Sequence, residues 1–68
     1  MMVATQIQTL RAELARVEAK SAKLATARSA LPPGTSRARV TRANARWARA
    51  AEHRDRLLAQ IEALEVQP

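Results

Sequence analysis

Large apolar residues in the first half of the chain recur at alternating steps of four and three, and then at two steps of seven. They are Val3, Ile7, Leu10, Leu14, Val17, Leu24 and Leu31. Ser21 and Arg28 occupy the two positions that the long steps skip. Because this spacing keeps the residues on one helical face and forms a heptad seam, it predicts an amphipathic helix over about residues 3–30.

A second seam runs through the other half of the chain, with steps of three and four throughout. Its positions are Val40, Ala43, Trp47, Ala50, Arg54, Leu57, Ile61 and Leu64, and Leu58 widens the apolar stripe near its end. No Gly or Pro interrupts either segment, and alanine, which is abundant in both, has the highest helix propensity. We predict a second helix over about residues 37–66.

The segment 31–36 carries the turn signals, since it holds the only Gly and two of the three Pro residues. Pro32 ends the preceding helix because its ring disfavours the helical conformation at the residue before it. Gly34 permits a tight reversal, and Thr35 or Ser36 can cap the helix that follows. A short turn of this kind makes consecutive helices antiparallel neighbours.

These features predict an all-α fold, a coiled-coil-like antiparallel helical hairpin that forms a single domain over residues 1–68. Folding the chain at the turn sets Leu10 opposite Leu57 and Ile7 opposite Ile61. The large ring of Trp47 then faces three small residues of the first helix, Ser21, Ala22 and Ala25. A large side chain opposite small ones favours interdigitated packing.

The hydrophobic core of such a hairpin is thin, because sixteen residues are Ala and there is no Phe or Tyr. The absence of Cys excludes disulfides and cysteine zinc sites. We therefore expect the hairpin to complete a four-helix bundle by dimerisation or to dock on a helical partner. The residues expected to form the core and interface are Ile7, Leu10, Leu14, Val17, Leu24, Trp47, Leu57, Leu58, Ile61 and Leu64.

Charge is sorted along the predicted hairpin, within a net charge of +6. Between Ala19 and Ala51 there are eight basic residues and no acid: Lys20, Lys23, Arg28, Arg37, Arg39, Arg42, Arg46 and Arg49. All six acidic residues lie outside this span with four arginines, so the turn half carries +8 and the terminal half −2. One end of the hairpin is suited to packing, and the other is suited to an anion.

The basic residues of the second helix share one side of it. Arg39, Arg42, Arg46, Arg49, His53 and Arg56 alternate at steps of three and four, beside the apolar seam. Such a row can follow a phosphate backbone, and the planar arginine side chain binds phosphate oxygens in pairs. The candidate anion-binding residues are the eight cations of the turn half: Lys20, Lys23, Arg28, Arg37, Arg39, Arg42, Arg46 and Arg49. No aromatic residue interleaves with the arginines to support base stacking.

Two functions remain open from the sequence, and neither is enzymatic. The first is a module that binds the backbone of RNA or DNA through the basic turn half and associates through the apolar terminal half. The second is a protein–protein interaction hairpin, such as an assembly subunit, adaptor or inhibitor, whose arginines meet an acidic protein or provide solubility. A membrane surface suits the chain less well, because the apolar stripe is narrow.

Three single residues each allow a structural and a functional interpretation. Trp47 is expected to anchor the seam. Arg54, also at a seam position, either pairs across the hairpin with Glu13 or Glu18 or extends outward over the core. The single His53 has no second ligand one turn away, so we expect it in solvent, with no metal site and no cofactor.

The first residues lack the basic start and unbroken apolar run of a secretory signal. No stretch approaches the roughly 20 apolar residues of a membrane span. We expect a cytoplasmic protein.

Overall fold

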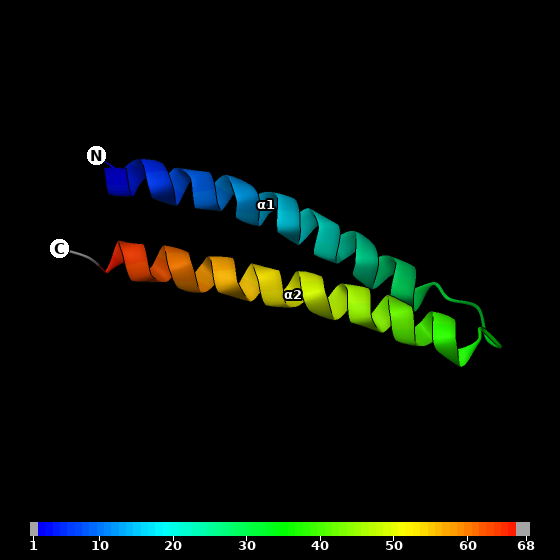
Figure 1. The fold of residues 1–68 in the computed structure, drawn as a ribbon. Coiled ribbons are helices and arrows are strands. Elements are labelled where there is room, and N and C mark those ends of the chain that lie inside the picture. Colours follow the sequence, from blue (N-terminus) through cyan, green and yellow to red (C-terminus); the bar gives the residue numbers. More distant parts are fainter. Residues whose placement is uncertain (1, 67–68) are drawn as a thin grey trace.

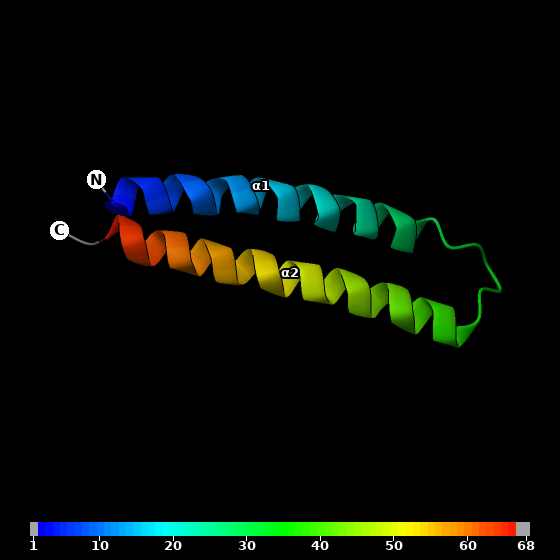
Figure 2. The same cartoon turned by 45° about the horizontal axis from the view of Figure 1, so that its top comes forward.

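The computed structural model describes residues 2–66 and contains two α-helices, α1 (Met2–Ser29) and α2 (Arg37–Glu65). The helices lie side by side in opposite directions along most of their length (Figures 1 and 2). The chain is therefore a helical hairpin, as the two seams and the turn predict. Its Cα atoms extend over 54 × 15 × 12 Å, so the hairpin is a rod.

Adjacent residues close the turn and cap the helix that follows it. Gly34 adopts a positive φ of 86°, a conformation that glycine reaches without steric cost. The amide of Thr35 donates to the carbonyl oxygen of Pro32 at 3.2 Å, and its Oγ1 donates to the same oxygen at 2.6 Å. Ser36 is the N-cap of α2, because its Oγ accepts a hydrogen bond from the Arg39 amide at 3.3 Å. Thr35 thus closes the turn and Ser36 starts the helix.

The two seams face each other and form the core. Its buried residues are Val17, Ser21, Ala50, Leu57 and Ile61. The other seam residues are half-buried, except Val3, which is exposed. No side chain in the described range is completely buried. On each helix the buried small residue, Ser21 or Ala50, lies nearer the turn than the buried large residues Val17, Leu57 and Ile61.

Two residues that the sequence predicts in the core and interface are more exposed to solvent than the seam pattern indicates. Leu58 is 46% exposed, because it lies beside the seam of α2 rather than on it. Trp47 is half-buried, and the guanidinium carbon of Arg28 lies 4.3 Å from the centre of its ring. Arg28 therefore covers a face of the ring, while Ala22, which the turn geometry predicts opposite Trp47, is exposed to solvent.

Candidate nucleic-acid interface

One side of the hairpin collects basic side chains from both helices. Two neighbouring hollows, of about 660 and 430 Å³, open between α1 and α2 on this side. Arg46 and Arg49 line both of them, so the hollows form one continuous depression. We call it the basic groove, and its basic lining residues are Lys20, Arg39, Arg42, Arg46, Arg49, His53 and Arg56.

Helical geometry explains why these α2 residues share one side. Each of them immediately precedes a seam position, as Arg46 precedes Trp47 and Arg49 precedes Ala50. Because the seam is held against α1, the preceding positions form a row along one edge of the contact. Steps of three and four residues place a side chain about every 5 Å along the helix axis. The row therefore repeats regularly for about five turns of α2.

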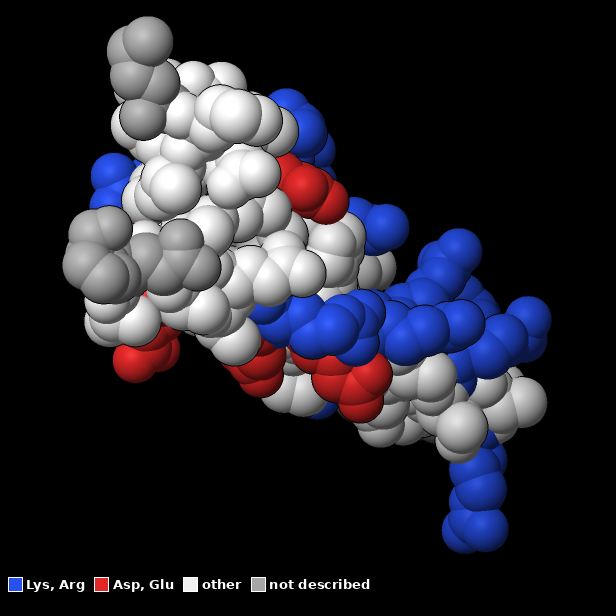
Figure 3. Space-filling model, turned by 60° about the vertical axis from the view of Figure 1, so that its left-hand side comes forward, with Lys and Arg blue, Asp and Glu red and all other residues white. Residues whose placement is uncertain are grey.

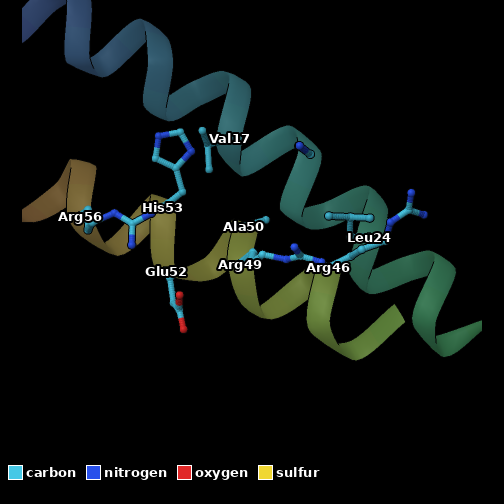
Figure 4. Close-up of a pocket in the computed structure, with 9 residues that line it drawn as sticks. Val17, Leu24, Arg46, Arg49, Ala50, Glu52, His53 and Arg56 are labelled. Atoms are coloured by element: carbon cyan, nitrogen blue, oxygen red, sulfur yellow. The ribbon is translucent and has the colours of Figure 1, made fainter. Parts of the chain in front are cut away.

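The floor of the basic groove is apolar. Val17, Leu24 and Ala50 line its larger part, and Leu31 and Ala43 line the part nearer the turn. In Figure 4 Val17 and Leu24 extend from α1 toward α2, and Arg46 and Arg49 lie along the α2 side of the same space. The groove thus has an apolar floor and a mainly basic rim.

The basic residues of the groove other than His53 are exposed and unpaired. Lys20, Arg39, Arg42, Arg46, Arg49 and Arg56 form no side-chain hydrogen bond or ion pair with any residue in the range 2–66. One acid, Glu52, also lines the groove, but Figure 4 shows its side chain directed away from α1. Charge in this part of the molecule is therefore left uncompensated by the fold.

All three ion pairs found within residues 2–66 belong to the terminal half. Arg11 Nη2 donates to Glu65 Oε2 at 2.9 Å across the hairpin, and Arg54 Nη2 donates to Asp55 Oδ1 at 3.2 Å. The third joins His53 Nε2 and Glu13 Oε1 at 3.3 Å, and is ionic when the imidazole is protonated. In Figure 3 a row of blue Lys and Arg side chains extends away from the end that carries the grey terminal residues. Within residues 2–66 the fold thus pairs three of the six acids, all in the terminal half, and forms no ion pair with the basic residues between Ala19 and Ala51.

One of these pairs decides between two interpretations left open by the sequence, and another corrects an expectation. Arg54 is half-buried and does not pair across the hairpin with Glu13 or Glu18, because its guanidinium group bonds to Asp55 on its own helix. His53, expected in solvent, is half-buried and pairs with Glu13 instead. The signal for the second pair is present in the sequence, since Glu13 and His53 both immediately precede seam positions. In an antiparallel pair of helices, corresponding flanks of the two seams lie on the same side.

The remaining candidate anion-binding residues do not line the basic groove. Lys23 and Arg37 are exposed on α1 and at the start of α2, and Arg28 is half-buried on Trp47. The spacing of the α2 arginines did not predict the contribution of α1 to the groove, which is Lys20 and much of the apolar floor.

The described residues include no group of three or more His, Asp or Glu side chains placed to hold a metal ion. Between residues 2 and 66, neither helix has the length of apolar sequence needed to cross a membrane.

Comparison of the chain with models of known protein families, with curated protein sequences and with solved structures finds no match. Its function must therefore be inferred from its own residues and geometry.

Proposed function

We propose that this hairpin is a non-enzymatic module that binds the phosphate backbone of nucleic acid in the basic groove. The observation that carries the proposal is the row of arginines that the fold leaves exposed and unpaired along a continuous depression. Nucleic acid is a regular polyanion, with a phosphate charge about every 3.4 Å of helix axis on each strand. A row that repeats about every 5 Å along one helix offers such a ligand several contacts at once.

Recognition in this groove reads the backbone and shape rather than the bases. No aromatic residue lines the groove, and Trp47 is engaged with Arg28 outside it. Base stacking therefore has no platform there, whereas phosphate contacts position a protein without selecting a sequence. We expect affinity that depends strongly on salt and weakly on sequence, for either RNA or DNA.

We also propose that the module associates through its terminal half, with itself or with a helical partner, and works in the cytoplasm. The support for association is the sparse core, since only five of the residues 2–66 are buried. Small helical scaffolds of this kind gain stability when further helices cover their seam.

An acidic protein partner is the alternative, and the apolar floor of the groove favours it. An amphipathic helix with apolar side chains on one face and Asp or Glu at the edges could occupy the groove formed by Val17, Leu24 and Ala50. The hairpin would then be an assembly subunit, adaptor or inhibitor. Binding to nucleic acid separates the two proposals.

The first test is a titration of labelled duplex DNA and of a structured RNA with the full chain at several salt concentrations. If four cations of the groove engage, log affinity should fall with log salt with a slope of about −4 on duplex DNA. A slope near zero, or no binding at low salt, would move the function to the acidic-partner alternative.

The matched variants compare two pairs of arginines at equal net charge. Replacing Arg46 and Arg49 by Gln removes cations that line both parts of the groove. Replacing Arg11 and Arg37 by Gln removes the same charge outside it. We expect the first variant to bind at least tenfold more weakly with a slope reduced by about 2, and the second to change binding by less than threefold. Equal losses would show a diffuse charge effect without a defined groove.

A further inference from the structure

The surface near the chain ends differs in chemistry from the basic groove. A third hollow, of about 540 Å³, opens between α1 and α2 in the terminal half. We call it the terminal hollow, and it is lined by Thr5, Gln6, Thr9, Leu10, Gln60, Ala63 and Leu64. None of these residues is charged. Figure 3 shows the same contrast, with a broad white surface at the end that carries the termini and blue side chains beyond it.

The terminal hollow and the basic groove open on the same side of the hairpin. Gln60 and Ala63 immediately precede the seam residues Ile61 and Leu64, just as the arginines of the groove precede theirs. The row that begins at Arg39 thus continues along α2 into the hollow and changes from basic to uncharged on the way.

Apolar surface left open by the hairpin is concentrated in the same half. The large apolar residues that are exposed within residues 2–66 are Met2, Val3, Leu58 and Val66, at 37–78% of their full surface. Leu10 and Leu64 in the hollow are only half-buried. Exposed apolar surface bordered by polar groups is typical of an interaction site.

A second copy of this chain fits the terminal hollow better than a charged partner does. At a two-fold axis a surface meets itself, so a charged surface repels its own copy and an uncharged one does not. The amides of Gln6 and Gln60 both donate and accept hydrogen bonds, so they can pair with the same residues of a second copy. The leucines between them supply apolar contact.

We propose that the terminal hollow is a two-fold interface with a second copy of this chain, and that the dimer carries its basic grooves at opposite ends and bridges two segments of nucleic acid. The interface stands independently, and the bridging rests on the proposed function. An average specific interface takes about 800 Å² from each partner. This is about one-seventh of the 5359 Å² surface of the hairpin, so part of the terminal half suffices.

Charge decides how the two hairpins align. A side-by-side arrangement in the same direction would bring the eight turn-half cations of each copy together, which repel. Complete antiparallel overlap would press the arginines of the groove onto the uncharged hollow and remove them from water without a partner. Overlap of the terminal halves alone avoids the first cost and keeps the groove cations from Lys20 to Arg49 in water, so that His53 and Arg56 are the only basic groove residues within the overlap. Since groove and hollow share a side, the two-fold axis makes the two grooves face opposite directions.

The size of the particle tests the alignment. Analytical ultracentrifugation should show a dimer, and small-angle X-ray scattering should give a longest dimension about one and a half times the 54 Å of one hairpin. A monomer at all concentrations up to about a millimolar would overturn the proposal. A dimer no longer than a single hairpin would do so as well, because it would indicate complete overlap.

The interface is tested with two glutamines of α1 that lie on different sides of the helix. Gln6 lines the terminal hollow, whereas Gln8 is exposed and lies outside it. Gln6→Glu places like charges near the two-fold axis, and we expect the dimer to dissociate at least tenfold more readily. Gln8→Glu makes the same chemical change in the same part of the helix and should leave the dimer unchanged. Helicity by circular dichroism checks that both variants fold.

Bridging is measured by capture of a second, labelled DNA duplex on beads that already carry one duplex. Wild-type chain and Gln8→Glu should capture the second duplex, and Gln6→Glu should capture less than a tenth as much while a single duplex is still bound. Capture that is equal for the two variants would refute the bridging dimer. If neither variant nor wild type binds even one duplex, the proposed function fails, while ultracentrifugation still decides the interface.

Discussion

Adjacent leucines on α2 have different structural roles in this hairpin. Leu57 lies on the seam and is 4% exposed, whereas Leu58 lies one position further and is 46% exposed. A helix turns about 100° per residue, so neighbours in sequence face different directions. The sequence places both in the packing set because both are apolar and close to the seam.

The difference can be measured with the same substitution at both positions. Leu57→Ala should lower the free energy of unfolding by about 2–5 kcal/mol, because it removes buried methyl groups and leaves a cavity. Leu58→Ala should lower it by less than about 1 kcal/mol in dilute protein, because most of that surface is already in water. Urea denaturation followed by circular dichroism gives both values. Equal losses would indicate that Leu58 is covered in solution.

Arg28 shows how a basic residue can be taken out of an anion site by its surroundings. Its guanidinium group lies 4.3 Å from the centre of the Trp47 ring, within range of a cation–π interaction. Such a contact contributes roughly 0.5–1 kcal/mol at exposed sites. The residue therefore stabilises the turn half of the hairpin and is less free than the groove arginines to meet a phosphate.

At the scale of the elements, the turn sets the antiparallel arrangement on which the groove depends. Gly34 carries the single positive φ found among residues 2–66, and a Cβ atom added there would meet nothing within 4 Å. A substitution at this position therefore costs backbone strain without a steric clash. Thr35 and Ser36 then hold the turn and the start of α2 by hydrogen bonds.

Gly34→Ala should destabilise the hairpin by about 1–2 kcal/mol, because an L-residue with a Cβ atom is strained at positive φ. Gly34→Asn should cost less, since asparagine tolerates this conformation better. Thermal unfolding of the two variants at equal concentration checks the order. Equal midpoints for glycine and alanine would mean that the turn relaxes to another conformation.

The whole molecule is a charged rod in which the ion pairs lie in one half and the other half is basic. The three ion pairs of residues 2–66 lie in the terminal half, and the cations of the basic groove other than His53 have no partner there. Like charges about 5 Å apart along one helix repel each other, which opposes folding. We therefore expect added salt to stabilise the folded hairpin.

Raising the ionic strength from about 0.01 to 0.15 M shortens the Debye length from roughly 30 to 8 Å. We expect the unfolding midpoint to rise, because screening weakens repulsion among the arginines more than it weakens three exposed pairs. The Arg46→Gln, Arg49→Gln variant should show a smaller rise. Thermal unfolding by circular dichroism at both salt concentrations provides the measurement. A midpoint that falls with salt would show that attraction between opposite charges dominates.

The local signals of this chain were sufficient to predict its elements. Helix ends predicted near residues 3, 30, 37 and 66 compare with Met2, Ser29, Arg37 and Glu65 in the structure. The reason is physical: heptad spacing, alanine content and a single Pro-Pro-Gly turn are properties of neighbouring residues. The arginine row of α2 was predictable for the same reason, since one helix fixes which of its own residues share a side.

The sequence by itself thus determined the two helices, their seams and the row of arginines. Only the tertiary structure decided where residues of the two helices meet. It placed Lys20 and the apolar floor of α1 beside the arginine row, paired His53 with Glu13 and put Arg28 over Trp47. It also decided that Arg54 bonds within α2 rather than across the hairpin. These contacts depend on the register and rotation of two helices packed together, which periodicity within either helix leaves open.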